Sequence, residues 1–210
     1  MKLFDPRLYL VIGLADCGGR PLGTVLSAAV EGGVTLVQLR EKGLDEEAFI
    51  QRAREVKALL RPRGVPLIIN DSLKVALAVD ADGLHVGQSD LSPAQVRAHM
   101  GPEAILGVSI GNLEELARTD LTGVDYVGCG PVYGTTTKDD AGSAIGSMGL
   151  ASVAGKVSLP VVGIGGITAD RLAQLHGCGA SGVAVVSAIA GAHDPKQAAQ
   201  DLRKAIALSL

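Results

Sequence analysis

Short apolar runs rich in β-branched residues alternate along the whole chain with longer amphipathic stretches. Runs of this kind, bounded by turn residues, are typical of buried parallel strands, whereas apolar residues at helical spacing predict helices. The predicted strands lie near residues 8–12, 35–40, 65–70, 83–86, 105–109, 125–129, 161–165 and 182–186. The pattern therefore predicts eight strand–helix units in succession.

Signals for helix starts lie between the predicted strands. Asp45 precedes EEAFIQRAREVKALL, whose first turn is acidic, and Asn112 opens NLEELARTDL in the same way. An Asp or Asn side chain accepts hydrogen bonds from the free amides of the first turn, and acidic residues there favour the helix dipole. Asp194 followed by Pro195 predicts the start of the last helix, because proline is favoured at the first helical position.

Eight units at near-even spacing predict one α/β domain over residues 1–210, folded as a (β/α)8 TIM barrel. The alternative architecture is an open doubly wound sheet, in which strands and helices also alternate. The number and spacing of the units favour the closed barrel, since eight parallel strands close this fold.

The amino-acid composition limits which residue types fill the core and which classes of partner are expected. Hydrophobic residues make up 47% of the chain and aromatic residues only 2%, so we expect Val, Leu, Ile and Ala to fill the core. The 19 basic and 22 acidic residues leave a net charge of −3, which disfavours a general polyanion-binding surface. We therefore expect no nucleic-acid partner.

Targeting signals are missing from the sequence. The three cysteines are an odd number without CxxC spacing, and the first thirty residues lack the order of a signal peptide. The longest apolar runs fall far short of the roughly 20 residues that a membrane-spanning helix needs. We expect a soluble cytoplasmic protein with no membrane partner; a homo-oligomer is compatible with the sequence.

Polar residues gather where the predicted strands end, and in a TIM barrel the catalytic groups lie in the loops that follow the strands. Taken in strand order, these residues are Gln38, Arg40, Lys42, Asn70, Asp71, Gln88, Asp90, Ser109, the Thr135–Thr137 run with Lys138, Gly165, Gly166 and Ser187. The sequence therefore predicts a polar site at this end of the barrel.

Asp71 and Asp90 follow neighbouring strands, so their carboxylates can converge on one ion. Mg²⁺ binds proteins through one or two carboxylates together with substrate phosphate oxygens. The pair therefore predicts a magnesium–phosphate site. The alternative interpretation is structural: Asp71 caps the helix that begins at Ser72, and Asp90 opens the turn before the next helix.

Arg40, Lys42 and Lys138 supply positive charge near these carboxylates. Arg can donate bidentate hydrogen bonds to phosphate and Lys supplies a point charge, so together they can neutralise a diphosphate. Alternatively, they are solvated loop charges paired with Glu41 and Asp139. The threonine run can donate hydroxyl hydrogen bonds to phosphate, although such a run is also ordinary loop composition.

The segment GIGGIT at residues 163–168 ends the seventh predicted strand, and we expect it to open a helix. Glycines let the backbone approach a ligand closely, and a helix N-terminus offers free amides to an anion. Ser187 then completes a second phosphate site, unless it only caps the short segment after it. The alternative for the glycines is a tight strand-to-helix turn.

Other catalytic classes find little support. His85 lies within a predicted strand and is interpreted as a structural residue, and no zinc-ligand spacing or GxSxG motif is present. What remains is a site for phosphates and Mg²⁺ with few acid–base groups. Such a site assists a phosphate or diphosphate to leave, which predicts a transferase or lyase.

The chain resembles the thiamine phosphate synthase family over nearly its whole length. The matching segments are VQLREK at 37–42, IIND at 68–71, ADGLHVGQSDL at 81–91, GVS at 107–109, DYVGCGPVYGTTTKDDA at 125–141, VVGIGGIT at 161–168 and GVAVVSAI at 182–189. The resemblance implies coupling of hydroxymethylpyrimidine diphosphate to hydroxyethylthiazole phosphate, or its carboxylate, by a dissociative, Mg²⁺-assisted substitution. The products are thiamine phosphate and diphosphate.

The resemblance also implies roles for individual residues. The implied Mg²⁺ ligands are Asp71 and Asp90. The implied pyrimidine diphosphate residues are Gln38, Arg40, Lys42, Asn70, Ser109 and Lys138, among which Arg40, Ser109 and Lys138 are the catalytic candidates. The implied thiazole phosphate residues are Thr135, Thr137, Gly166, Val186 and Ser187.

Several positions depart from the family pattern, and two rival functions follow. Gly111 and Gly134 stand where His and Pro are usual, Ala141 and Gly142 stand where an Arg sometimes follows the Lys-Asp segment, and Arg171 replaces a usual Asn. One rival is a thiazole tautomerase, which resembles this fold but typically lacks the two carboxylates. The other is a non-catalytic barrel that binds a phosphorylated metabolite.

Overall fold

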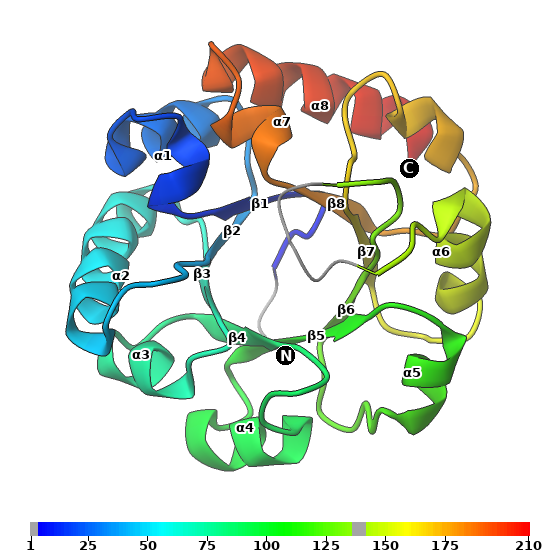
Figure 1. Ribbon diagram of the computed structural model, residues 1–210, viewed down its shortest axis with the longest axis horizontal. Helices are drawn as coiled ribbons and strands as arrows, with labels where there is room; N and C mark the ends of the chain where they lie inside the picture. Colours follow the sequence, from blue (N-terminus) through cyan, green and yellow to red (C-terminus); the bar gives the residue numbers. More distant parts are fainter. Residues whose placement is uncertain (1–3, 136–141) are drawn as a thin grey trace.

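The computed structural model of the protein describes residues 4–135 and 142–210. Eight parallel strands close into a barrel in chain order (Figure 1). The strands are β1 (Leu8–Ile12), β2 (Leu36–Leu39), β3 (Leu67–Asn70), β4 (Gly83–Val86), β5 (Ile105–Ile110), β6 (Tyr126–Cys129), β7 (Val161–Ile164) and β8 (Gly182–Val185). Because β1 pairs with both β2 and β8, the predicted closed barrel is confirmed and the open sheet is wrong.

Helices form a ring outside the strands (Figure 1). The helical elements are η1 (Leu14–Cys17), α1 (Leu22–Glu31), α2 (Glu46–Leu60), η2 (Arg61–Arg63), α3 (Leu73–Ala78), α4 (Pro93–Met100), α5 (Leu113–Arg118), α6 (Gly146–Ala154), η3 (Leu172–Leu175), α7 (Ser187–Ala190) and α8 (Pro195–Ser209). Asp45, Asn112 and Asp194 are the N-caps of α2, α5 and α8, as predicted, and each side chain accepts an amide hydrogen bond from the first turn. Within the described residues, no helix is both long and apolar enough to cross a membrane.

The prediction of a helix directly after the GIGGIT segment is wrong. Gly165 and Gly166 have φ angles of 100° and 62°, which turn the chain away from a helical path. The short 3₁₀ helix η3 begins only at Leu172. The connection after β7 therefore provides a glycine turn in place of a helix N-terminus.

The strands carry apolar side chains on both faces, because helices cover the outside and the barrel encloses the inside. The outward residues pack with the helices in one large cluster of mainly aliphatic side chains. The inner cluster consists of Tyr9, Val11, Leu36, Ile68, Ile105, Tyr126, Val162 and Ala184. The expected aliphatic core is confirmed for the outer cluster, and the inner cluster is aliphatic apart from Tyr9 and Tyr126.

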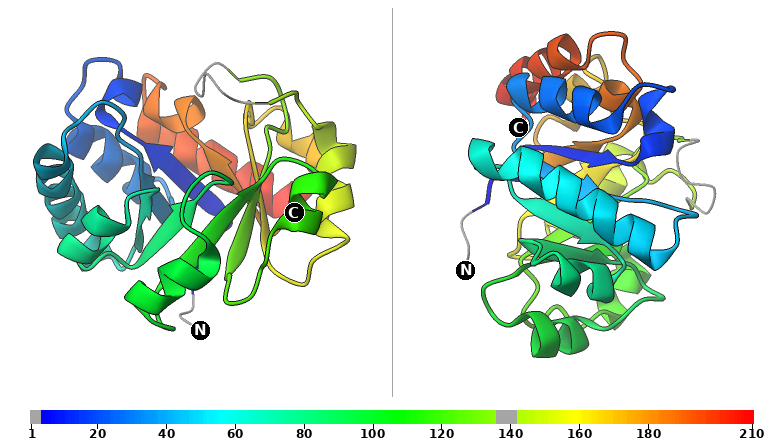
Figure 2. Two further views of the ribbon diagram at one scale, coloured as in Figure 1. Left: turned by 60° about the horizontal axis from the view of Figure 1, so that its bottom comes forward. Right: turned by 90° about the vertical axis from the view of Figure 1, so that its left-hand side faces the viewer.

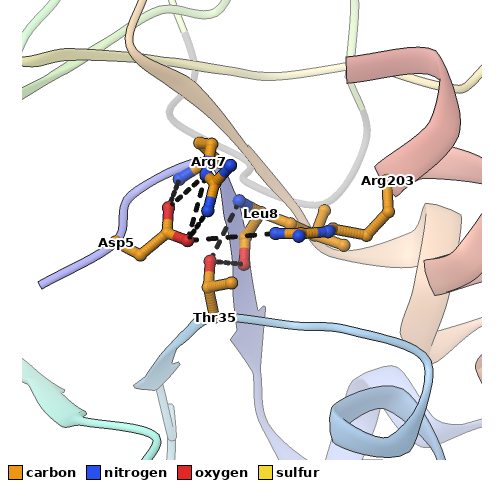
Figure 3. Close-up of polar contacts among 5 residues, drawn as sticks. All are labelled: Asp5, Arg7, Leu8, Thr35 and Arg203. Atoms are coloured by element: carbon orange, nitrogen blue, oxygen red, sulfur yellow. Dashed lines mark hydrogen bonds and ion pairs between the residues drawn. The ribbon is translucent and has the colours of Figure 1, made fainter. Parts of the chain in front are cut away.

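The end of the barrel at which the strands begin, here called the base, is covered by the N-terminal segment (Figure 2). The ring of Phe4 lies 5.5 Å from that of Tyr126. Asp5 accepts hydrogen bonds from the Arg7 guanidinium at 2.6 to 3.0 Å and lies 3.9 Å from Arg203 (Figure 3). The hydrogen bond from Arg7 lowers the pKa of the Asp5 carboxyl. These contacts tie the start of β1 to α8.

Candidate active site

The opposite end, where the strands stop, is here called the mouth, and strand periodicity brings three predicted site residues to it. Gln38 and Asn70 each lie two residues after a residue of the inner cluster, and Ser109 lies four residues after one. Because alternate residues of a strand share a face, all three lie on the inner side of the barrel. They occupy the last inward positions of β2, β3 and β5.

A chain of hydrogen bonds crosses the barrel interior just below the mouth. Gln38 Nε2 donates to the Tyr9 hydroxyl at 2.7 Å, and the Tyr9 and Tyr126 oxygens are 2.8 Å apart. The Tyr126 oxygen lies 2.9 Å from His85 Nδ1, and His85 Nε2 lies 2.8 Å from Ser109 Oγ. Five strands thus contribute to one network, which joins two predicted site residues to three that were not predicted.

The three added residues are buried polar groups in an apolar interior. His85 is 7% exposed and Tyr9 2%, and Tyr126 has no exposed surface. Burial raises the pKa of both tyrosine hydroxyls, so they remain neutral. The interpretation of His85 as a structural residue is incomplete, since its ring bonds directly to Ser109. A polar residue at an inward strand position is the sequence signal that identifies all three.

Two glycines make room for this network. A Cβ atom on Gly107 would lie 2.1 Å from Tyr126 Cζ and 2.5 Å from His85 Nδ1. A Cβ atom on Gly128 would lie 3.0 Å from His85 Cε1. The neighbouring rings therefore require a glycine at position 107, and a side chain at position 128 would need the His85 ring to shift slightly.

Asp71 follows β3 directly and has an unusual backbone conformation. Its φ angle is 61°, in the left-handed region, which costs a non-glycine residue about 1–2 kcal/mol. Its amide donates to the His85 carbonyl at 2.9 Å, and its Oδ1 accepts from Asn70 Nδ2 at 2.7 Å. The N-cap of α3 is Ser72, whose hydroxyl accepts from Val75, so the interpretation of Asp71 as the cap is wrong. Strain at an exposed carboxylate beside the mouth indicates a functional role.

Asp90 closes the turn after β4. Its Oδ2 accepts from the Gly87 amide at 2.7 Å, while Ser92 and Gln95 form the capping box of α4. Asp90 is thus a turn residue, but it closes the turn after β4 and does not open one before α4; its exposed carboxylate remains a candidate ligand. In the part of the chain that the structure describes, no group of three or more His, Cys, Asp or Glu residues is arranged to hold a metal. Two carboxylates nevertheless fit Mg²⁺, which takes its other ligands from phosphate and water.

The cations after β2 are not neutralised by their neighbour. Glu41 accepts hydrogen bonds from the Leu14 amide at 3.0 Å and from Arg52 Nη1 at 3.1 Å. Across residues 4–135 and 142–210, Arg40 and Lys42 form no ion pair, so their predicted pairing with Glu41 is wrong. Both cations remain available to an anionic ligand. Thr137, Lys138 and Asp139 lie outside the described residues.

On the other side of the mouth, the loop after β6 runs along the glycine turn after β7. The Tyr133 amide donates to the Gly165 carbonyl at 3.0 Å, and a Cβ atom on Gly166 would lie 2.5 Å from the Gly134 carbonyl oxygen. Thr135 is the next residue along this loop and is half-buried. This close backbone approach brings two predicted phosphate residues, Thr135 and Gly166, into adjoining loops.

Arg171, one of the departures from the family pattern, supports this loop pair. Its Nη1 donates to the Gly166 carbonyl at 2.8 Å, and its guanidinium carbon lies 5.3 Å from the centroid of the Tyr133 ring. Val186 and Ser187 lie at the start of α7, directly after β8, the neighbouring strand in the barrel. The predicted phosphate residues thus follow β6, β7 and β8.

Comparison with known proteins identifies the family. A family model described as thiamine monophosphate synthase matches residues 8–189. A thiamine-phosphate synthase from Xanthobacter autotrophicus is 52% identical over 205 residues, which cover 98% of this chain and 97% of that protein. The chain belongs to the thiamine monophosphate synthase family. A second relative, the thiamine-phosphate synthase of Azorhizobium caulinodans, is 50% identical over 98% of this chain and 97% of its own length.

A solved structure agrees with this assignment. A thiamine phosphate pyrophosphorylase from Pyrococcus furiosus superimposes with a TM-score of 0.88 at 32% identity, and the match covers 98% of each chain. The protein is therefore a transferase of this family, and the resemblance seen in the sequence motifs is confirmed.

Proposed function

We propose that the protein couples hydroxymethylpyrimidine diphosphate to hydroxyethylthiazole phosphate, giving thiamine phosphate and diphosphate. The observation that carries this proposal is membership of the family along nearly the whole chain. The layout of the mouth supports it, because cations and carboxylates follow β2, β3 and β4, while phosphate-binding candidates follow β6, β7 and β8. Two phosphorylated substrates need two such regions.

The diphosphate belongs, in this proposal, on the side of β2 to β5. Arg40 and Lys42 contact its oxygens, and Gln38, Asn70 and Ser109 bind from the inner strand positions; Lys138 joins them by family resemblance. Asp71 and Asp90 would hold Mg²⁺. When bound, Mg²⁺ supplies positive charge that stabilises the departing diphosphate. The absence of ion pairs at Arg40 and Lys42 within the described residues supports a role in binding an anion.

The thiazole phosphate belongs on the side of β6 to β8. Thr135 and Thr137 donate hydroxyl hydrogen bonds, and Gly166 and Ser187 donate backbone amides to the phosphate. Val186 packs beside the thiazole. The positive φ of Gly166 and its close approach to the neighbouring loop support backbone contact, because no side chain fits there.

The proposed reaction needs little acid–base catalysis. The bond between the pyrimidine methylene carbon and the diphosphate oxygen breaks first, and the thiazole nitrogen then forms its bond to that carbon. The electron-rich pyrimidine stabilises the cation between these steps. Arg40, Ser109 and Lys138 assist by stabilising negative charge on the leaving diphosphate.

The test is a coupled assay on the purified protein. With both substrates and Mg²⁺, thiamine phosphate and diphosphate should appear in equal amounts, and chelation of Mg²⁺ should abolish both. A folded protein that binds the substrates without forming product would support the non-catalytic rival. Conversion of the thiazole phosphate alone, without the pyrimidine substrate, would support the tautomerase.

A further inference from the structure

We propose that Tyr126 is a positioning residue, which sets the direction of the buried hydrogen-bond chain and thereby turns the Ser109 hydroxyl into a donor at the mouth. The inference rests on the proposed role of Ser109 beside the leaving diphosphate. It concerns a side chain buried below the mouth, which acts through His85.

The direction of the chain follows from counting protons. Tyr9 and Tyr126 are neutral phenols with one proton each, because their burial raises the pKa of both hydroxyls. The Gln38 amide supplies the proton of the first hydrogen bond. The Tyr9 hydroxyl then donates to the Tyr126 oxygen, and the Tyr126 hydroxyl donates to Nδ1 of His85.

We call donation from Gln38 through Tyr9 and Tyr126 to His85 the forward order. In the reverse order, in which Tyr126 donates to Tyr9, one proton has no acceptor. If Tyr126 donated to Tyr9, the Tyr9 oxygen would receive protons from both neighbours, and its own proton would have no place in the chain. The forward order gives each bond one proton and lets each phenol accept once and donate once. Because Tyr9 is only 2% exposed, leaving its proton unpaired costs about 1–3 kcal/mol.

The forward order fixes the tautomer of His85. Because Nδ1 accepts from Tyr126, the N–H of the ring is the one at Nε2, which is 2.8 Å from Ser109 Oγ. Ser109 accepts that hydrogen bond, so its own proton is left for an acceptor in the mouth. An oxygen of the departing diphosphate is such an acceptor, and a hydrogen bond to it stabilises the negative charge that develops there.

Packing keeps Tyr126 in the required place. Its ring lies 5.5 Å from the rings of Phe4 and His85 and 5.9 Å from that of Tyr9, measured between centroids. Gly107 leaves no room for a side chain between Tyr126 and His85. The hydroxyl therefore has a single orientation, which a phenylalanine ring would preserve without the hydrogen bonds.

The first test removes only this hydroxyl. In Tyr126→Phe we expect kcat to fall about 10-fold, with KM changed about 2-fold or less, because the donor is misoriented but still present. Removing a donor outright costs about 100-fold or more, and Ser109→Ala should show that larger loss. Thr35→Val is the control: it removes a hydroxyl bonded to Leu8 at the base, and kcat should stay unchanged (Figure 3).

A double variant separates positioning from general destabilisation. If Tyr126 acts through Ser109, adding Tyr126→Phe to Ser109→Ala should cause no further loss of kcat. A further 10-fold loss in that background would overturn the inference. Normal kcat in Ser109→Ala alone would instead show that the proposed role of Ser109 is wrong.

A direct measurement of the tautomer covers the case in which Tyr126→Phe does not fold. Replacing the three exposed histidines, His99, His176 and His193, by Gln leaves His85 as the sole histidine of the chain. Nitrogen-15 NMR of this otherwise intact protein should show a proton on Nε2 and none on Nδ1. A ring protonated at Nδ1 would overturn the inference, whatever the variants do.

Discussion

The base and the mouth of the barrel use their charged residues in opposite ways. At the base, Asp125 precedes β6 and accepts hydrogen bonds from Arg97 at 2.5 Å and from the Leu106 amide at 2.8 Å. At the mouth, Arg40 and Lys42 have no ion-pair partner among the described residues. The base therefore holds the strands in place, whereas the mouth keeps charge available for a ligand.

Each end of the barrel has, among the described residues, one non-glycine residue with a positive φ angle, but the two carboxylates differ in their partners. At the mouth, Asp71 has a φ of 61° and its carboxylate makes no helix cap, whereas at the base Asp80 has a φ of 50° and its carboxylate lies 3.1 Å from Lys57 Nζ. At the base, the acidic side chains of Asp5 and Asp125 are bonded to neighbouring arginines and amides. The acidic side chains named at the base are thus paired, whereas the cations after β2 and the strained Asp71 mark the candidate site at the mouth.

The largest expected effect comes from removing charge at the mouth. In Asp71→Asn we expect kcat/KM to fall about 100-fold, because one proposed Mg²⁺ ligand loses its charge. Asn tolerates the left-handed conformation, so Tm should change by about 2 °C or less. Product formation and thermal denaturation measure the two effects.

The matched control is Asp80→Asn, which changes the other non-glycine residue with positive φ, at 50°. Its kcat/KM should equal that of the unaltered protein. Equal activity of the Asp71 and Asp80 variants would contradict the metal assignment and remove the distinction between the two ends.

At the base the expected effect is on stability. Arg97→Met should lower the free energy of unfolding by about 3 kcal/mol, because the carboxylate of Asp125, only 12% exposed, loses its partner. The turnover of the folded enzyme should change little. Urea unfolding measures the loss, and an activity assay at low temperature tests the second expectation.

Lys204→Met provides the comparison for an exposed pair. Lys204 lies 3.9 Å from Asp201, with side chains 75% and 51% exposed, and its loss should cost about 0.5 kcal/mol or less. If both variants lost equal stability, the base pair would be no more important to the fold than an ordinary surface pair.

A smaller effect on stability is expected at alkaline pH, and it originates from the buried tyrosines below the mouth. Burial raises the pKa of Tyr9 and Tyr126, so above about pH 10 the unfolded chain releases these protons before the folded one. The folded state then binds more protons, and stability falls as pH rises. Burial also raises the pKa of Cys129 to about 12, so its thiol acts in the same direction from a lower pH.

Urea unfolding between pH 8 and pH 11 tests this expectation. The slope of the free energy of unfolding against pH should be negative and should become shallower in Tyr9→Phe, which removes one of the buried phenols. A slope that is unchanged in this variant would show that Tyr9 does not titrate differently in the folded and unfolded states.

The local sequence pattern determined where most strands and helices begin and end. Strand positions agree with the predictions to within two residues, and Asp45, Asn112 and Asp194 cap the helices that they were expected to begin. Strand periodicity and capping depend on neighbours in the sequence, so they can be recognised without the fold. The same periodicity places Gln38, Asn70 and Ser109 at the mouth, although their roles remain proposals.

Only the closed barrel decided which side chains meet. Tyr9 and Tyr126 are 117 positions apart, and their hydroxyls bond because β1 and β6 face each other across the interior. Likewise, Glu41 pairs with Arg52 and not with the adjacent cations, and the glycine turn after β7 excludes the expected helix. The sequence by itself determined the strands, the helices and the candidate ligand-binding residues. Their partners depend on barrel closure and packing, because contacts between distant positions have no local signal.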